Sequence, residues 1–251
     1  ILSGGADIAI VAAVAYDFAF WQGTPPGVIS PTGRCRVFAK DADGVIPSEG
    51  VGAIVLARPD IKAAPPRALL LGTALGHAGS RSTLGQPSTD SQAETLKAAL
   101  AVAGTSDSEV RYVEAHGTGT LLGDPIEIAG LTAAFRTTTD RKQFCAIGSV
   151  KTNIGHAAMA AGVAGLMKVL LMMRHRRIPP SLHFKTPNRH IDFANSPFRV
   201  ATENTPWKPG SGRLRAAVSS FGMSGTNAHM VVEEAPAGTS RQSRAIALPP
   251  M

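Results

Sequence analysis

The segment that decides the fold runs from Val110 to Phe135 and reads VRYVEAHGTGTLLGDPIEIAGLTAAF. Residues 110–115 form a largely apolar run that predicts a strand. A glycine-rich loop follows, and Pro125 in a first-turn position predicts a helix from about Pro125 to Phe135. This strand, loop and helix predict one unit of an α/β fold.

The same order of elements repeats directly afterwards. Residues Phe144–Val150 predict a strand, Lys151–His156 a loop, and Ala157–Arg174 a long apolar helix. Strands that alternate with helices predict a largely parallel sheet covered on both sides.

The remaining pattern surrounds these two units. The apolar run Ile8–Val14 predicts a strand buried on both faces, and the polar loop Ser80–Asp90 is expected to cap the helix after it. Stretches rich in glycine and proline, 23–50 and 178–206, predict turns, and 59–66 predicts a linker. The other predicted elements are the strands Val51–Ala57, Leu69–Ala74, Ala216–Ser220 and Ala228–Glu233 and the helix Ser91–Val102.

Composition excludes several classes of protein. With 251 residues, 44% of them hydrophobic and 17% charged, the chain can bury a core and is neither a coiled coil nor disordered. The net charge of +7 favours an acidic partner, whereas an aromatic content of 5% disfavours nucleic-acid binding by base stacking. We therefore expect no nucleic-acid partner.

Cysteine content and hydropathy bear on the compartment. Cys35 and Cys145 are the only cysteines, which excludes a disulfide framework and a cysteine-rich zinc site and suits a reducing compartment. The most apolar stretch, Ala157–Met173, contains Lys168 and is shorter than the roughly 20 residues of a membrane span. We expect a cytoplasmic protein with no metal and no membrane partner, in which this stretch is a buried helix.

Three loops at predicted strand ends carry the chemistry, as is usual in α/β folds. In Glu114–Glu127, His116 leaves a strand into two glycines, although a plain glycine turn with a satisfied histidine fits equally well. In Gly148–His156, a lysine precedes a histidine by five residues at a helix N-terminus, where the helix dipole favours a neutral imidazole. In Ser219–Asn227, backbone N–H groups are candidates for an oxyanion hole, a weak signal by itself.

Neither cysteine is a convincing nucleophile for these histidines. Arg34 and Arg36 flank Cys35 and would lower its pKa, yet a structural cysteine in this turn-rich segment is at least as plausible. Cys145 lies in a predicted core strand, where burial would make it inert. A stand-alone Cys-His hydrolase is therefore the weakest reading.

Together these motifs resemble the β-ketoacyl synthase domain of modular type I polyketide synthases, in the thiolase-like superfamily. The resemblance extends from about the first residues to Pro236. It rests on VEAHGTGTLLGDPIEI (113–128), GSVKTNIGHAAMAAGVAGLMK (148–168), IPPSLHF (178–184) and SSFGMSGTNAHMVVEEAP (219–236).

The resemblance implies a layered α-β-α-β-α fold made of two similar halves. It implies that 1–64 is the end of the N-terminal half, that 65–235 is the whole C-terminal half, and that 236–251 is a linker leaving the domain. It also implies decarboxylative Claisen condensation, in which a cysteine holds the acyl chain and a malonyl unit on a carrier protein's phosphopantetheine arm attacks it. No cofactor bound by this chain itself is expected.

Residue by residue, the resemblance assigns expected roles. His116, His156 and Lys151 match the catalytic histidines and the active-site lysine. Met223 matches a gate whose N–H joins the oxyanion hole. Thr118 and Thr120 match threonines that contact pantetheine, while Asp124 and Glu127 match acidic residues that brace the site; Asn227 is a further supporting candidate.

The same resemblance places the nucleophilic cysteine before the segment that aligns with Ile1–Val14. We therefore expect an acyltransferase whose partners are an acyl carrier protein, the N-terminal half that carries the cysteine, and a second copy in a homodimer. The chain alone is expected to be inactive. A non-elongating ketosynthase, which only binds or transfers the acyl chain, is the alternative; the presence of His116 counts against it.

Overall fold

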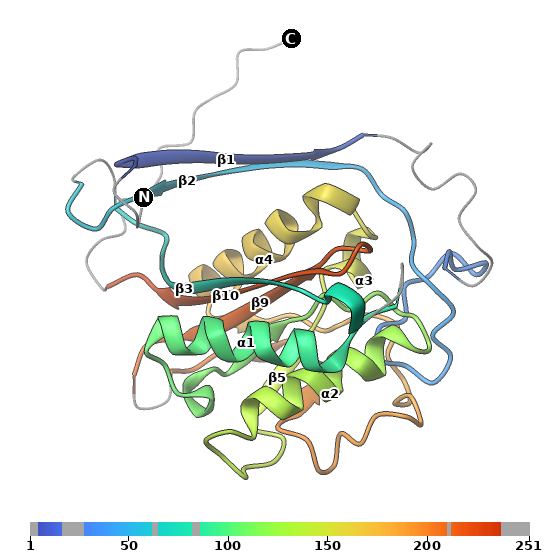
Figure 1. Cartoon of the computed structure of the whole chain (residues 1–251). Helices are drawn as coiled ribbons and strands as arrows, with labels where there is room; N and C mark the ends of the chain where they lie inside the picture. Colours follow the sequence, from blue (N-terminus) through green and yellow to red (C-terminus); the bar gives the residue numbers. More distant parts are fainter. Residues whose placement is uncertain (1–4, 17–27, 62–64, 82–85, 210–211, 237–251) are drawn as a thin grey trace.

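The fold has four layers, which alternate between sheet and helix (Figure 1). The computed structural model describes residues 5–16, 28–61, 65–81, 86–209 and 212–236. A two-stranded sheet lies on one side of the long helix α4, and a six-stranded sheet lies on the other side of it. Helices α1 and α2 cover the far face of the larger sheet.

The elements of the described residues have the following bounds. The helices are α1 (Thr89–Ala103), α2 (Gly123–Phe135), the single turn α3 (Lys151–Ile154) and α4 (Ala161–His175), with short 3-10 turns η2 (Gly79–Arg81), η3 (Asp107–Glu109) and η4 (Ala158–Ala160). The strands are β1 (Ile8–Ala15), β2 (Gly50–Ala57), β3 (Ala68–His77), β4 (Tyr112–Glu114), β5 (Cys145–Gly148), β6 (Arg177–Ile178), β7 (Phe198–Val200), β8 (Thr205–Pro206), β9 (Arg215–Phe221) and β10 (Thr226–Glu234).

The six-stranded sheet has the order β3-β10-β9-β4-β5-β7. Strands β9, β4, β5 and β7 run parallel to one another, while β10 pairs antiparallel with both β9 and β3. The prediction of a largely parallel sheet is therefore confirmed for the four strands from β9 to the edge strand β7. The antiparallel part arises because a tight turn joins β9 directly to β10, without a crossover helix.

Helix α1 packs closely on β3 and β10. Ser88 is its N-cap, and the Ser88 hydroxyl accepts a hydrogen bond from the Ser91 amide, as the polar loop before the helix predicted. At Gly72, a Cβ atom would lie 2.5 Å from the Ala103 nitrogen, so only glycine permits this approach of helix and strand. The edge-to-face pair Phe135 and Phe198 fills the core between this helical layer and the sheet.

The region predicted as a loop and one long helix is more segmented. Residues Lys151–Ile154 form the helical turn α3 rather than a loop, and η4 precedes α4. The change of direction passes through Ala158, whose φ of 37° lies in the left-handed region. This path brings His156 beside the site described below.

Helix α4 lies between the two sheets, in agreement with the prediction that the apolar stretch forms a buried helix. Gly165 faces Glu114 and Val218 of the large sheet, and Gly52 of β2 faces Val163 and Met167 on the other side. The segment Ala158–His175 is long and apolar enough to cross a membrane by length and composition, with a mean hydropathy of 1.2. Its position between the sheets explains that hydropathy without a membrane.

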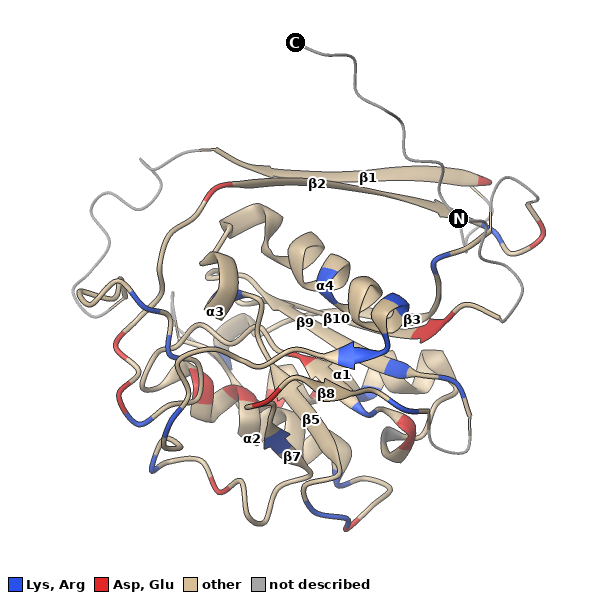
Figure 2. Ribbon diagram, turned by 180° about the vertical axis from the view of Figure 1, so that it is seen from behind, with Lys and Arg blue, Asp and Glu red and all other residues tan. Residues whose placement is uncertain are grey.

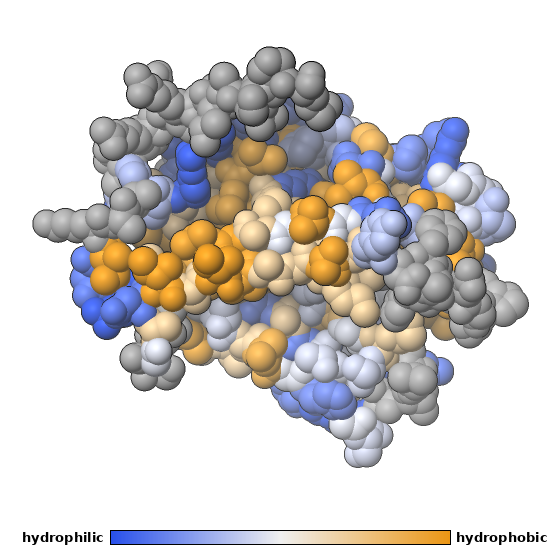
Figure 3. All heavy atoms as spheres, turned by 90° about the horizontal axis from the view of Figure 1, so that it is seen from above, coloured by the Kyte–Doolittle hydropathy of each residue, from blue (hydrophilic) through white to orange (hydrophobic). Residues whose placement is uncertain are grey.

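The prediction that β1 is buried on both faces is wrong for the described chain. Within the part of the chain that the structure describes, strand β1 pairs only with β2, and one face of this ribbon rests on α4 and η4. The other face is open: Ile10 is 74% exposed and Val51 is 81% exposed. Figure 3 shows this apolar band from above, and Figure 2 shows that the two strands carry almost no charge.

Candidate functional site

The two loop histidines meet at one end of the parallel strands. His116 follows β4 and His156 follows α3, which itself follows β5. Their ring centroids are 5.5 Å apart, with an interplanar angle of 83°. The structure thus brings together the two histidines that the resemblance assigns to one catalytic pair.

Backbone hydrogen bonds determine which ring nitrogen of each histidine carries the proton. The Phe221 amide donates to Nδ1 of His116 at 3.3 Å, and the Ala158 amide donates to Nδ1 of His156 at 3.1 Å. A neutral imidazole that accepts at Nδ1 carries its proton at Nε2. Both rings therefore offer an Nε2–H donor.

Burial keeps both rings neutral. Desolvation lowers the pKa of His156 to about 3 and lowers the pKa of His116 well below its ordinary value. The nearby Lys151 ammonium lowers both pKa values further. The neutral state was predicted, but its main cause is burial rather than the helix dipole.

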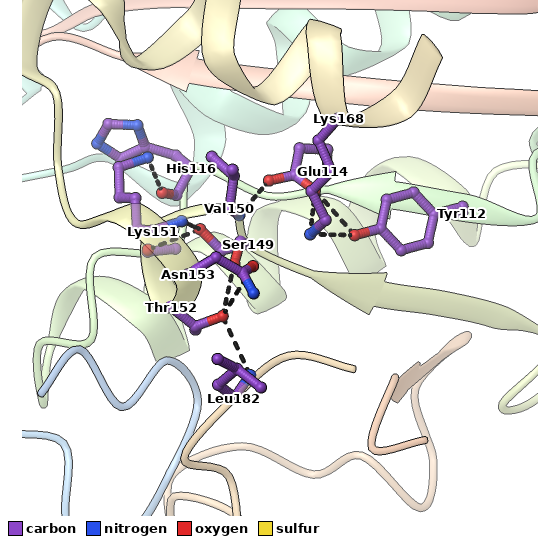
Figure 4. A network of polar contacts seen from close by, with 11 residues as sticks. Tyr112, Glu114, His116, Ser149, Val150, Lys151, Thr152, Asn153, Lys168 and Leu182 are labelled. Carbon is purple, nitrogen blue, oxygen red and sulfur yellow. Dashed lines mark hydrogen bonds and ion pairs between the residues drawn. The ribbon is translucent and has the colours of Figure 1, made fainter. Parts of the chain in front are cut away.

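Lys151 begins α3 and is itself buried, with 3% of its surface exposed. Its ammonium donates to the backbone carbonyl of His116, as Figure 4 shows. Burial lowers the pKa of Lys151, and the carboxylates of Glu127 and Glu114 oppose that shift. The lysine thus ties the second loop to the first and places a positive charge beside both rings.

Two carboxylates of α2 hold the backbone of the first loop from behind. Glu127 accepts hydrogen bonds from the amides of His116 and Gly117, each at 2.7 Å. Asp124 accepts from the amides of Thr118 and Gly119 at 3.2 and 3.1 Å. Burial raises the pKa of Asp124 to about 6 and also raises that of Glu127. These contacts position His116 without touching its ring.

A distant segment, residues 28–50, wraps around both loops. The Phe38 amide donates to Asp124 at 2.6 Å, and the Gly44 amide donates to the Gly119 carbonyl at 2.9 Å. The His156 amide donates to the Ile46 carbonyl at 2.6 Å. The turn-rich stretch is therefore a structural wall of the site.

The two threonines of the first loop are partly exposed beside the histidines. The hydroxyl oxygens of Thr118 and Thr120 lie 3.2 Å apart. The Thr120 hydroxyl also accepts from the Gly123 amide at 3.1 Å, at the start of α2. Thr120 thus helps to begin the helix that carries the bracing carboxylates.

The third loop contributes a residue that the sequence did not single out. Phe221 donates its amide to His116, and its ring centroid lies 5.4 Å from that of His116. Met223 lies in the β9–β10 turn and is 55% exposed. Asn227 is not brought into the site: its buried side chain donates to the Ser91 hydroxyl of α1 at 2.9 Å, on the helix-covered side of the sheet.

Neither cysteine has the environment of a nucleophile. Burial raises the pKa of Cys35 to about 12, and the Asp124 carboxylate adds to this shift. The lower pKa predicted from the flanking arginines is wrong, and Arg36 pairs with Asp41 and Asp43 instead. Cys145 is buried in β5, and burial raises its pKa as well. Among the described residues there is also no group of three or more His, Cys, Asp or Glu side chains arranged to hold a metal ion.

A second buried cluster lies next to the site and was missed from sequence. Tyr112 and Glu114 of β4 meet Lys168 of α4 (Figure 4). The available signal was Lys168 itself, the one charged residue of the apolar stretch Ala157–Met173, because a buried charge requires a partner.

Sequence models of one family match almost the whole chain. "Beta-ketoacyl synthase, N-terminal domain" matches residues 1–60, "Beta-ketoacyl synthase, C-terminal domain" matches 67–185, and "Ketoacyl-synthetase C-terminal extension" matches 187–250.

Curated relatives are much longer polyketide synthases. The chain is 47% identical over 212 residues to polyketide synthase PksL of Bacillus subtilis, covering 83% of this chain and 5% of that protein. It is 44% identical over 239 residues to erythronolide synthase EryA2 of Saccharopolyspora erythraea, covering 94% of this chain and 6% of that protein.

Solved structures agree with the sequence matches. The chain superposes on the ketosynthase from module 6 of the bacillaene synthase of Bacillus subtilis with a TM-score of 0.90 and 42% identity, covering 94% of this chain. It spans 43% of the length of that ketosynthase. The predicted thiolase-like fold is confirmed, and the chain belongs to the β-ketoacyl synthase family, among the ketosynthase domains of modular polyketide synthases.

Proposed function

We propose that this chain supplies the decarboxylation and condensation machinery of a complete ketosynthase domain that elongates polyketide chains. The proposal rests on the pair of neutral imidazoles of His116 and His156. Each carries its proton on Nε2, and the two ring centroids are 5.5 Å apart. Two preorganised donors in a site partly screened from water suit an oxygen that gains negative charge.

In the proposed reaction, the bond from the malonyl α-carbon to its carboxylate breaks and carbon dioxide leaves. The electron pair moves onto the thioester oxygen, and the resulting enolate accepts hydrogen bonds from His116 and His156. The enolate carbon then attacks the acyl thioester carbon on a cysteine, so that a carbon–carbon bond forms and the cysteine sulfur leaves as thiolate. Burial keeps both rings neutral, the Lys151 ammonium adds to this effect, and Lys151 also fixes the His116 loop.

The other first-loop residues receive supporting roles in this proposal. Asp124 and Glu127 hold the loop backbone, and Thr118 and Thr120 contact the phosphopantetheine arm of an acyl carrier protein. Met223 gates the acyl entrance and contributes its N–H to the oxyanion hole. Asn227 acts only through the packing of α1 on the sheet.

The nucleophilic cysteine is proposed to come from the rest of the N-terminal half. Both cysteines of the chain are buried and unsuited, and the chain spans 43% of a solved relative. The open face of the β1–β2 ribbon and an apolar cavity of about 570 Å³ between β2, α3 and α4 offer the contact surface for that half. In this proposal, the end of the N-terminal half and the C-terminal half meet at about residue 64. Without the rest of the N-terminal half, we expect the chain to be inactive.

The complete domain is proposed to be a cytoplasmic acyltransferase that acts as a homodimer with acyl carrier proteins. A non-elongating ketosynthase is the less favoured alternative, because both histidines are present and correctly oriented as donors.

The test is decarboxylation of a malonyl carrier protein by the complete domain. His116→Ala is expected to lower kcat by about 10²–10³-fold, the usual effect of losing one such donor. The exposed His190 provides a matched control, since His190→Ala removes a histidine that lies outside the site. Unchanged decarboxylation in His116→Ala would refute the assigned role.

A further inference from the structure

Tyr112, Glu114 and Lys168 form a closed buried triangle that the proposed reaction does not use. The Lys168 ammonium lies 2.8 Å from Glu114 Oε2, and the Tyr112 hydroxyl donates to the same oxygen at 2.8 Å. Lys168 also donates to the Tyr112 oxygen at 2.9 Å. The Glu114 side chain is 1% exposed and that of Lys168 is 10% exposed. Because buried ion pairs contribute little net stability, stability alone does not explain this cluster.

The other oxygen of Glu114 reaches the second catalytic loop. Glu114 Oε1 accepts a hydrogen bond from the amide of Val150, the residue directly before Lys151 (Figure 4). Val150 is the N-cap of α3 and makes no capping bond with its own side chain. The carboxylate thus satisfies an amide at the start of the turn that carries Lys151.

Glu114 is also close to the first catalytic loop along the chain. It precedes His116 by two residues, and the Lys151 ammonium donates to the His116 carbonyl. The charge of Glu114 also favours the ammonium form of Lys151. One carboxylate therefore joins the strand that leads to His116 with the turn that begins at Lys151.

The surrounding backbone leaves room for this cluster at two glycines. A Cβ atom on Gly148 would lie 2.9 Å from the Tyr112 hydroxyl oxygen. A Cβ atom on Gly165 would lie 3.1 Å from Glu114 Cγ. The geometry of the triangle is therefore fixed by contacts from β5 and α4 as well as by its own bonds.

We propose that Glu114 and Lys168 are positioning residues of the condensing site. Lys168 holds the Glu114 carboxylate, and Glu114 holds the Val150 amide, so that Lys151 stays on the His116 carbonyl. This inference rests on the proposed function, because it assigns the two residues to the decarboxylation step.

The experiment uses the complete ketosynthase domain with Lys168→Met, Lys168→Arg and Glu114→Gln. We expect Lys168→Met and Glu114→Gln to lower kcat for malonyl decarboxylation by about 10- to 100-fold, as small displacements of catalytic groups do, with KM for the malonyl carrier protein unchanged. Lys168→Arg should restore most of kcat because it keeps the positive charge. Lys97→Met, a charge loss on the exposed side of α1, is the matched control and should behave like the parent.

A spectroscopic readout separates this inference from the proposed function. In a domain labelled with ¹⁵N-valine, the Val150 amide resonance should move in Glu114→Gln and Lys168→Met and stay in place in Lys97→Met. If the parent does not decarboxylate the malonyl carrier protein, the proposed function fails. Independently of that result, a Val150 resonance that does not move in Glu114→Gln and Lys168→Met would overturn the positioning contact. If the parent is active and both variants keep its kcat, the inference is overturned even if their thermal stability falls.

Lys168→Met leaves a buried carboxylate without its cation and is therefore at risk of not folding. The double variant Glu114→Gln/Lys168→Met removes both charges together and avoids this cost. It should fold with near-parent stability and still show the reduced kcat at unchanged KM. Parent-like kcat in the double variant would overturn the inference.

Discussion

Gly117 offers a direct test of how tightly the first loop is held. Its φ is +40°, which L side chains rarely adopt, and an added Cβ atom would lie 2.7 Å from Val37 Cγ1 and 2.9 Å from Ser149 Cβ. Its amide donates to Glu127, and its carbonyl accepts from the Ser149 hydroxyl at 3.1 Å. Gly117→Ala must therefore strain the backbone and displace neighbours beside His116.

Gly79 is a matched control because it separates these two costs. Its φ is +57°, but an added Cβ atom would meet nothing within 4 Å. Gly79→Ala should cost only the left-handed strain, about 1–2 kcal/mol. Gly117→Ala should cost about 2–5 kcal/mol, because crowding in a packed region adds about 1–3 kcal/mol to that strain.

The assays are urea unfolding and malonyl decarboxylation, both on the complete domain. Gly117→Ala should lower kcat by more than about 10-fold where the protein is still folded, since displacement of a catalytic group costs up to about 10²-fold. Gly79→Ala should keep the parent kcat. Equal destabilisation by the two variants, or full activity in Gly117→Ala, would refute the reasoning.

Four further predictions concern the buried groups. His156→Ala should lower the rate of decarboxylation by about 10²–10³-fold. In Lys151→Met, the acid limb of the pH–rate profile for decarboxylation should move to higher pH, because removing the nearby cation raises the pKa values of both histidines. An acid limb that does not move would contradict this prediction. The free energy of unfolding should fall as the pH drops from about 6.5 towards 3, because buried His229, with a pKa of about 3, binds its proton in this range only after unfolding. In urea titrations, His229→Gln should reduce this dependence of the unfolding free energy on pH. Cys35, with its pKa raised to about 12, should resist iodoacetamide at neutral pH in the folded domain, and rapid labelling measured by mass spectrometry would show that it is not buried.

Many elements of the fold are determined by neighbouring residues in the sequence, and sequence patterns predict these elements well. The apolar run before His116 and the proline at the start of α2 define β4, its loop and its helix without reference to the rest of the chain. The same holds for β5, for α4 apart from its first turn, and for the cap of α1 at Ser88. The resemblance also assigned His116 and His156 to one catalytic pair, and the structure places their rings side by side.

What the sequence left open depends on contacts between distant residues. The tautomer of His116 is fixed by the amide of Phe221, 105 residues away, and Asp124 is held by the amide of Phe38, 86 residues away. The open face of β1 and the contact of Asn227 with Ser91 of α1 likewise follow from which elements lie against each strand. The periodicity of apolar residues predicts only on which face of its own helix or strand a residue lies. The partner on that face, and hence the charge and the proton position in the site, is decided by tertiary packing.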